Sequence, residues 1–127
     1  MILITRGDVR IPGTFLVDLS LRERLGQFGN KEFMVLSDTI NYLLTLSRLV
    51  NIFERDEIYN QLIFSTPSVR TKTTICLTEE NHQYLISLTD GTSFKPYHIF
   101  SDVVGQALQL ANTYSLDYVI KKKEKLI

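Results

Sequence analysis

The chain has one cysteine, no tryptophan and no excess of either charge. A single cysteine excludes an internal disulfide and favours a reducing compartment. No apolar run reaches the roughly 18–20 residues that a membrane span needs. The first residues carry neither the basic stretch nor the small-residue cleavage site of a signal peptide. We therefore expect a cytoplasmic protein that does not contact a membrane.

Motifs for catalysis, metal binding or nucleotide binding are also missing. The only histidines, His82 and His98, and the only cysteine, Cys76, lack the spacing of metal ligands. Neither type of glycine-rich phosphate loop is present. The neighbouring acids Glu79 and Glu80 do not share one helix face, so they do not suit an acid–base pair. We expect no enzyme, no metal and no cofactor.

Composition and charge suit one globular domain over residues 1–127. Hydrophobic residues make up 44% of the chain and charged residues 22%. Fourteen basic residues balance fourteen acidic ones, whereas a nucleic-acid-binding protein is usually basic. The bases are nevertheless grouped, in "RTK" at 70–72 and in "KKKEK" at 121–125. Because the local pattern decides where a polyanion can lie, zero net charge does not exclude nucleic acid.

The first half predicts a strand and then helices. "TFLVDLS" (14–20) reads as a strand that follows a turn at Pro12-Gly13, and Ser20 with Glu23 forms a capping box for the next helix. Ser37-Asp38 caps a long helix over 37–53. Residues 54–64 continue as helix, and "STPSVR" is a linker.

The second half shows a similar order. "KTTICL" reads as a strand, and Thr78 is a good N-cap for the helix after it. A loop around 90–96 follows, and near it Tyr97 and His98 stand out as exposed side chains suited to contact a partner. Ser101-Asp102 caps the last long helix, and 115–127 forms a helix with a basic end.

An internal repeat connects the halves. "LSDTINYLLTLSRLV" (36–50) aligns with "FSDVVGQALQLANTY" (100–114) at an offset of 64, which places Ser37 opposite Ser101. "FLVDLS" (15–20) aligns with "TTICLT" (73–78) at an offset of 58. The difference between the two offsets predicts a longer loop in the second copy. The chain then divides into a first copy (14–53), a connecting helix and linker (54–70), a second copy (71–114) and a basic C-terminal helix (115–127).

The strand-helix-helix unit, above all "TKTTICLTEENHQYLISLTDG" followed by "FSDVVGQALQLA", resembles the ribbon-helix-helix DNA-binding family of Arc/MetJ/CopG type. The resemblance implies a mostly α fold with a short antiparallel two-stranded ribbon. Two copies in one chain imply a tandem pseudo-dimer, similar to tandem proteins of conjugative plasmids and related mobile elements. The implied function is sequence-specific binding of double-stranded DNA, as a transcription regulator or a DNA-processing accessory of a mobile element or virus.

The base-reading residues follow from strand periodicity, if the ribbon enters the major groove. With Ile75 and Leu77 inward, the outward residues of the second strand are Lys72, Thr74 and Cys76. With Phe15, Val17 and Leu19 inward, those of the first are Thr14, Leu16 and Asp18. Lysine can donate to guanine, threonine can contact thymine, and aspartate can accept from cytosine. We expect bases to be read by Lys72, Thr74, Cys76, Thr14 and Asp18.

Phosphate contacts are the second part of the implied site. In the family, the N-terminus of each second helix binds a phosphate, which corresponds to Ser37 and Ser101 here. Simple helix capping explains both serines equally well. Further backbone contacts are expected from Arg70, Lys121, Lys122 and Lys123, although the lysines equally suit a solvated helix end.

Two other interpretations remain open. In the first, the chain is an α+β protein–protein interaction module without DNA binding, with an N-terminal β-meander of strands 2–5, 9–11 and 14–19 around a turn at Arg6-Gly7-Asp8. Zero net charge and Asp18 favour it. In the second, the ribbon-helix-helix fold is kept but mediates assembly with a protein partner or into a higher oligomer.

Overall fold

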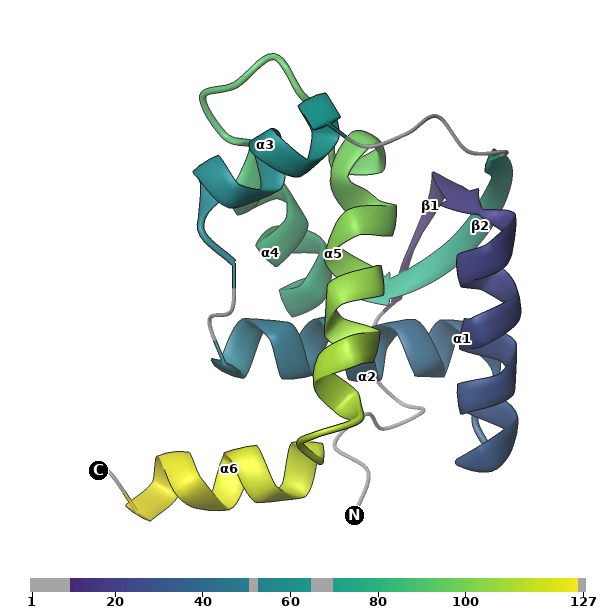
Figure 1. The fold of residues 1–127 in the computed structure, drawn as a ribbon, viewed down its shortest axis with the longest axis vertical. Coiled ribbons are helices and arrows are strands. Elements are labelled where there is room, and N and C mark those ends of the chain that lie inside the picture. Colours follow the sequence, from purple (N-terminus) through teal and green to yellow (C-terminus); the bar gives the residue numbers. More distant parts are fainter. Residues whose placement is uncertain (1–9, 51–52, 65–69, 126–127) are drawn as a thin grey trace.

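The computed structural model describes residues 10–50, 53–64 and 70–125 and combines a two-stranded antiparallel sheet with helices (Figure 1). This confirms the expectation of a mostly α fold with a short ribbon. Expected strand 2–5 and the turn at 6–8 lie outside the described residues. The elements in chain order are β1 (Arg10–Asp18), α1 (Leu19–Lys31), α2 (Leu36–Val50), α3 (Arg55–Phe64), β2 (Arg70–Thr78), α4 (Glu79–Thr89), α5 (Pro96–Ala111) and α6 (Leu116–Lys125).

The ribbon joins two segments that are far apart in the sequence. β1 and β2 pair over their full lengths, with Thr14 opposite Thr74 at the centre. Burial alternates as strand periodicity requires. The inward side chains Phe15, Val17, Ile75 and Leu77 are buried, so the predicted inward and outward sets are confirmed for these positions.

Each strand passes directly into a helix, but the two junctions differ. Thr78 is the N-cap of α4 as predicted, and its hydroxyl accepts from the N–H of Asn81 at 3.4 Å. At the other junction α1 begins at Leu19, so the predicted N-cap Ser20 is wrong. Asp18 occupies the N-cap position without a side-chain cap bond. Leu19 is 47% exposed and does not point inward, because it already belongs to the helix.

The predicted turn at Pro12-Gly13 is a second correction, because both residues lie inside β1. Proline has no N–H to donate, and in a two-stranded ribbon every strand is an edge strand where this is tolerated. Gly13 leaves room for the ring of Phe15, since a Cβ there would lie 2.9 Å from the ring atom Cε2. The Phe15 ring then stacks on Phe100 of α5, with centroids 4.4 Å apart.

The core lies between the inner face of the ribbon and the crossed helices α2 and α5 (Figure 1). The predicted apolar stripe of α2 is confirmed, because Ile40, Leu43 and Leu44 are fully buried. Helix α3 packs against α5, and its helical structure agrees with the helix predicted over 54–64. A smaller cluster attaches α6 to α2 and comprises Leu46, Leu116 and Val119.

Corresponding elements are separated by one constant interval. β2, α4 and α5 each begin 60 residues after β1, α1 and α2 begin. The offsets of 64 and 58 expected from the sequence are therefore wrong. Pro96 starts α5 five residues before Ser101, and proline suits the first turn of a helix because its missing N–H is not needed there. At the interval of 60, Ser101 corresponds to Asn41 and not to Ser37.

Within the described ranges, no helix has the length and apolar character needed to cross a membrane.

Candidate nucleic-acid interface

The outward side of the ribbon presents six side chains, which we call the outer face: Pro12, Thr14, Leu16, Lys72, Thr74 and Cys76. They form three cross-strand pairs. Thr14 pairs with Thr74 in the middle, Leu16 with Lys72 towards one end, and Pro12 with Cys76 towards the other. The predicted base-reading residues Thr14, Lys72, Thr74 and Cys76 thus share one surface, and Cys76 is the least exposed of these four.

Ion pairs occupy both ends of the ribbon. Nε of Arg70 lies 2.7 Å from Oδ1 of Asp18, the residue opposite it in the sheet. At the other end, Nη2 of Arg10 lies 3.0 Å from Oδ1 of Asp38 in the first turn of α2. The predicted base acceptor Asp18 and the predicted phosphate donor Arg70 therefore bind each other. The pair balances the negative charge of Asp18 with the positive charge of an arginine, and Lys72 is the one charged residue of the outer face.

Two buried side chains hold the ribbon from behind. Nδ2 of Asn41 donates to the carbonyl of Cys76 at 2.9 Å, and its Oδ1 accepts from the N–H of Thr78 at 2.9 Å. Ser101 in α5 makes the equivalent contacts with β1. Its hydroxyl donates to the carbonyl of Leu16 at 2.8 Å and accepts from the N–H of Asp18 at 3.4 Å. Each helix anchors the strand of the other half of the chain.

These contacts correct the role predicted for Ser101. The residue lies inside α5, only 4% of it is exposed, and its hydroxyl is bonded to the ribbon backbone. It cannot bind a phosphate at a helix N-terminus. Ser37, in contrast, is in the first turn of α2, and its hydroxyl accepts from the N–H of Cys76 at 3.5 Å. The N-terminus of α2 thus lies beside the ribbon, but the helix begins at Leu36, so Ser37 lies inside its first turn and is not the predicted N-cap.

The start of α5 lies beside the other part of the outer face. Tyr97, in its first turn, is 41% exposed. With four ribbon residues it lines an open hollow of about 310 Å³: Thr14, Phe15, Leu16 and Lys72. Next to it, Nδ1 of His98 accepts from the backbone N–H of Lys95 at 2.8 Å and fixes the turn that carries Tyr97. An aromatic ring, a lysine and a leucine therefore meet at one place.

A carboxyl group with a shifted pKa lies behind the Asp18–Arg70 pair. Burial raises the pKa of Asp102 above its usual value, the positive charge of Arg70 lowers it, and the negative charge of Asp18 raises it further. Asp102 follows Ser101 in α5 and shares a polar hollow of about 180 Å³ with Asp18 and Arg24. The pKa of Asp102 is therefore coupled to the charges of the ion pair at this end of the ribbon.

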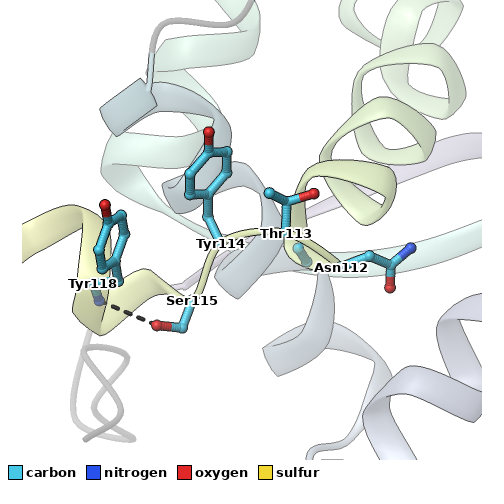
Figure 2. A pocket seen from close by; sticks show the side chains of 6 residues that line it. Asn112, Thr113, Tyr114, Ser115 and Tyr118 are labelled. Carbon is cyan, nitrogen blue, oxygen red and sulfur yellow. Dashed lines mark hydrogen bonds between the residues drawn. The ribbon is translucent and has the colours of Figure 1, made fainter.

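The predicted phosphate contacts Lys121 and Lys122 are not brought to the ribbon. They lie on α6, which leads away from the end of α5 opposite to Tyr97, and α5 is roughly 24 Å long (Figure 1). The side chain of Lys123 is outside the described part of the structure. A separate open hollow of about 510 Å³ lies at the turn into α6. Figure 2 shows Tyr114 and Tyr118 side by side there, with ring centroids 5.9 Å apart.

Sequence reasoning missed the polar network behind the ribbon. Asn81 is fully buried, and its Nδ2 donates to Oδ1 of Asn41 at 3.0 Å and to the hydroxyl of Thr45 at 3.2 Å. The signal was an asparagine directly after Ile40 in the apolar stripe of a helix. Buried amides are rare without a bonding role, so such a position indicates a structural contact.

No group of three His, Cys, Asp or Glu side chains in the described ranges is placed to hold a metal ion. No family model matches the chain, and neither a curated protein nor a solved structure does.

Proposed function

We propose that the chain is a tandem ribbon-helix-helix pseudo-dimer that binds double-stranded DNA sequence-specifically through the outer face of its ribbon. The observation that carries the proposal is the exchange of anchors between the halves. Asn41 holds β2 and Ser101 holds β1 through the same two backbone positions, 60 residues apart. Such reciprocity is expected where two equivalent strand-helix-helix units interlock around a two-fold axis between Thr14 and Thr74.

The outer face has the dimensions and chemistry for direct readout. A two-stranded ribbon fits the major groove, which is roughly 12 Å wide. Thr14 and Thr74 offer hydroxyl groups and methyl groups to base edges, and Lys72 offers donors to guanine O6 and N7. The helix N-termini that begin near Ser37 and Tyr97 lie beside the ribbon, where backbone phosphates would pass.

The biological role within this class follows from the resemblance. A transcription regulator and a DNA-processing accessory of a mobile element or virus both use this activity. Both act in a reducing compartment that contains DNA, in agreement with the single cysteine.

The test is fluorescence anisotropy of a labelled random-sequence duplex titrated with the protein over a series of salt concentrations. The proposal predicts that log K falls linearly with log salt, because phosphates are neutralised and counterions are released. Absence of binding at the lowest salt contradicts it. Single-stranded DNA of the same length is the control, since a major-groove reader prefers the duplex.

A second candidate is protein binding through the same ribbon. Arg10 and Arg70 form ion pairs with Asp38 and Asp18, and the net charge of the chain is zero. Pro12 and Leu16 make part of the outer face apolar. If the ribbon mediates self-assembly, sedimentation should show an oligomer at high protein concentration that Leu16→Lys abolishes. A monomer at all concentrations, together with salt-dependent DNA binding, favours the first proposal.

A further inference from the structure

We infer that the DNA site of this protein is not palindromic, and that one end of the outer face reads most of its bases. This inference rests on the proposed function and specifies its ligand. Dimeric DNA-binding proteins with identical subunits select inverted repeats, because each half reads the same bases. In this protein the buried residues that hold the ribbon, Asn41 and Ser101, correspond between the halves. The side chains of the outer face do not correspond, apart from the central threonines.

The difference is clearest at the two pairs that flank the centre. At the interval of 60, Leu16 corresponds to Cys76 and Pro12 corresponds to Lys72. The cross-strand pair Leu16–Lys72 therefore takes the place that Pro12–Cys76 takes at the other end. Only the central pair, Thr14–Thr74, is the same for both halves.

The two pairs offer different chemistry to a base edge. Lysine brings three N–H donors and a positive charge, which suit guanine O6 and N7. The apolar side chain of Leu16 suits the thymine methyl group. Proline has no donor on its backbone or side chain, and the thiol of Cys76 is a weak donor. The Leu16–Lys72 end can thus discriminate among base pairs, and the Pro12–Cys76 end has little with which to do so.

The surroundings of the two pairs increase this difference. Tyr97 extends the surface at the Leu16–Lys72 end and lines the hollow of about 310 Å³ with both residues. The corresponding residue at the other end is Ser37, whose hydroxyl accepts from the N–H of Cys76. Helix α2 has Asp38 in its first turn, whereas the first turn of α5 has no acidic residue. Asp38 is paired with Arg10, as Asp18 is paired with Arg70 at the other end, so the positive charge that distinguishes the Leu16–Lys72 end is that of Lys72.

The experiment is selection of bound sequences from a pool of duplexes with a randomised central segment. The expected result is one enriched motif without two-fold symmetry, with guanine and thymine concentrated on one side of its centre. An enriched inverted repeat overturns the inference but leaves the proposed function intact. Salt-dependent binding without any enriched motif overturns the inference and also the sequence specificity of the proposed function, and leaves only non-specific duplex binding. Loss of all binding, even at low salt, instead overturns the proposed function.

Two double variants test which end of the outer face selects the motif. Leu16→Ala/Lys72→Ala should weaken binding to the selected duplex by about tenfold or more relative to a random duplex. The matched control Pro12→Ala/Cys76→Ala changes the corresponding pair and should alter that ratio by less than about threefold. All four side chains lie on the outer face, and thermal unfolding checks that both variants fold. Equal losses in the two variants contradict the inference.

Base analogues give a second readout that does not depend on folding. Replacing thymine by uracil in the conserved half of the motif removes the 5-methyl group. Wild-type protein should bind the uracil duplex more weakly, and Leu16→Ala should bind both duplexes equally. The same loss in Leu16→Ala as in wild type would show that Leu16 does not read the methyl group.

Discussion

Asn41 holds strand β2 in the same way that Ser101 holds strand β1, and the two residues are 60 positions apart. Each side chain bonds one carbonyl and one N–H, two residues apart on the opposite strand. Because α2 anchors the strand of the second half and α5 that of the first, neither half can complete the ribbon alone. We expect the two halves to unfold together.

Asn41→Ala should lower the free energy of unfolding by about 2–3 kcal/mol. The change leaves the buried N–H of Thr78 without its acceptor. An unsatisfied buried N–H lowers the stability of the protein by more than its hydrogen bond would contribute. Urea unfolding followed by far-UV circular dichroism measures it. Asn60→Ala, on the exposed side of α3, is the control and should stay within about 0.5 kcal/mol of wild type. Equal effects in the two variants would contradict the anchoring role.

Two glycines of α1 should respond to alanine in opposite directions. A Cβ at Gly29 would lie 2.5 Å from the hydroxyl of Thr39 and 2.9 Å from the carbonyl of Met34, so Gly29→Ala should lose about 1–3 kcal/mol. A Cβ at Gly26 meets nothing within 4 Å, and Gly26→Ala should gain about 0.5–1 kcal/mol from helix propensity. Thermal unfolding of both variants distinguishes the two environments. A gain at Gly29 would show that α1 packs differently.

Asp102→Asn should raise the melting temperature near neutral pH and have little effect in acid. Burial raises the pKa of this carboxyl group, so the folded state holds a proton that the unfolded state releases from roughly pH 4 upward. Stability from this group therefore falls as pH rises between the unfolded and the folded pKa, and the loss persists at higher pH. Melting temperatures of wild type and variant across this range test the sign. A difference that is constant with pH would exclude titration of Asp102 as its source.

Lys72→Ala and Thr74→Ala should affect DNA binding in different ways. Removing a cation that lies close to the DNA should reduce the slope of log K against log salt by about one, as well as the preference for the selected sequence. Thr74→Ala should reduce the preference and leave the slope unchanged. Anisotropy titrations with selected and random duplexes separate the two quantities. If both variants keep the wild-type slope and sequence preference, Lys72 and Thr74 do not contact the bases.

Features that depend on residues close together in the sequence, such as strand faces and helix starts, were predicted from local patterns. The alternation of Thr74, Ile75, Cys76 and Leu77 identified the inner and outer sides of β2 correctly, and Thr78 identified the start of α4. Periodicity works here because each strand has one side on the core and one side in solvent.

Contacts between distant residues could not be predicted in this way. Asp18 looked like a free outward carboxylate, but Arg70, 52 positions later, lies opposite it in the sheet. Ser101 looked like a helix cap because Ser-Asp recurs at 37–38, yet Pro96 begins the helix earlier. Only the pairing of β1 with β2 reveals which side chains meet, and that pairing depends on the whole core.

Alkylation of Cys76 tests whether DNA covers the ribbon, since this residue is the only cysteine and lies on the outer face. The rate of reaction with a maleimide is measured in the absence and in the presence of saturating duplex DNA, with urea-unfolded protein as the reference for full exposure. If the ribbon enters the major groove, bound DNA should protect Cys76, and protein alkylated beforehand should no longer bind. An unchanged rate on protein that anisotropy shows to be bound would mean that the DNA lies on another surface and not on the ribbon.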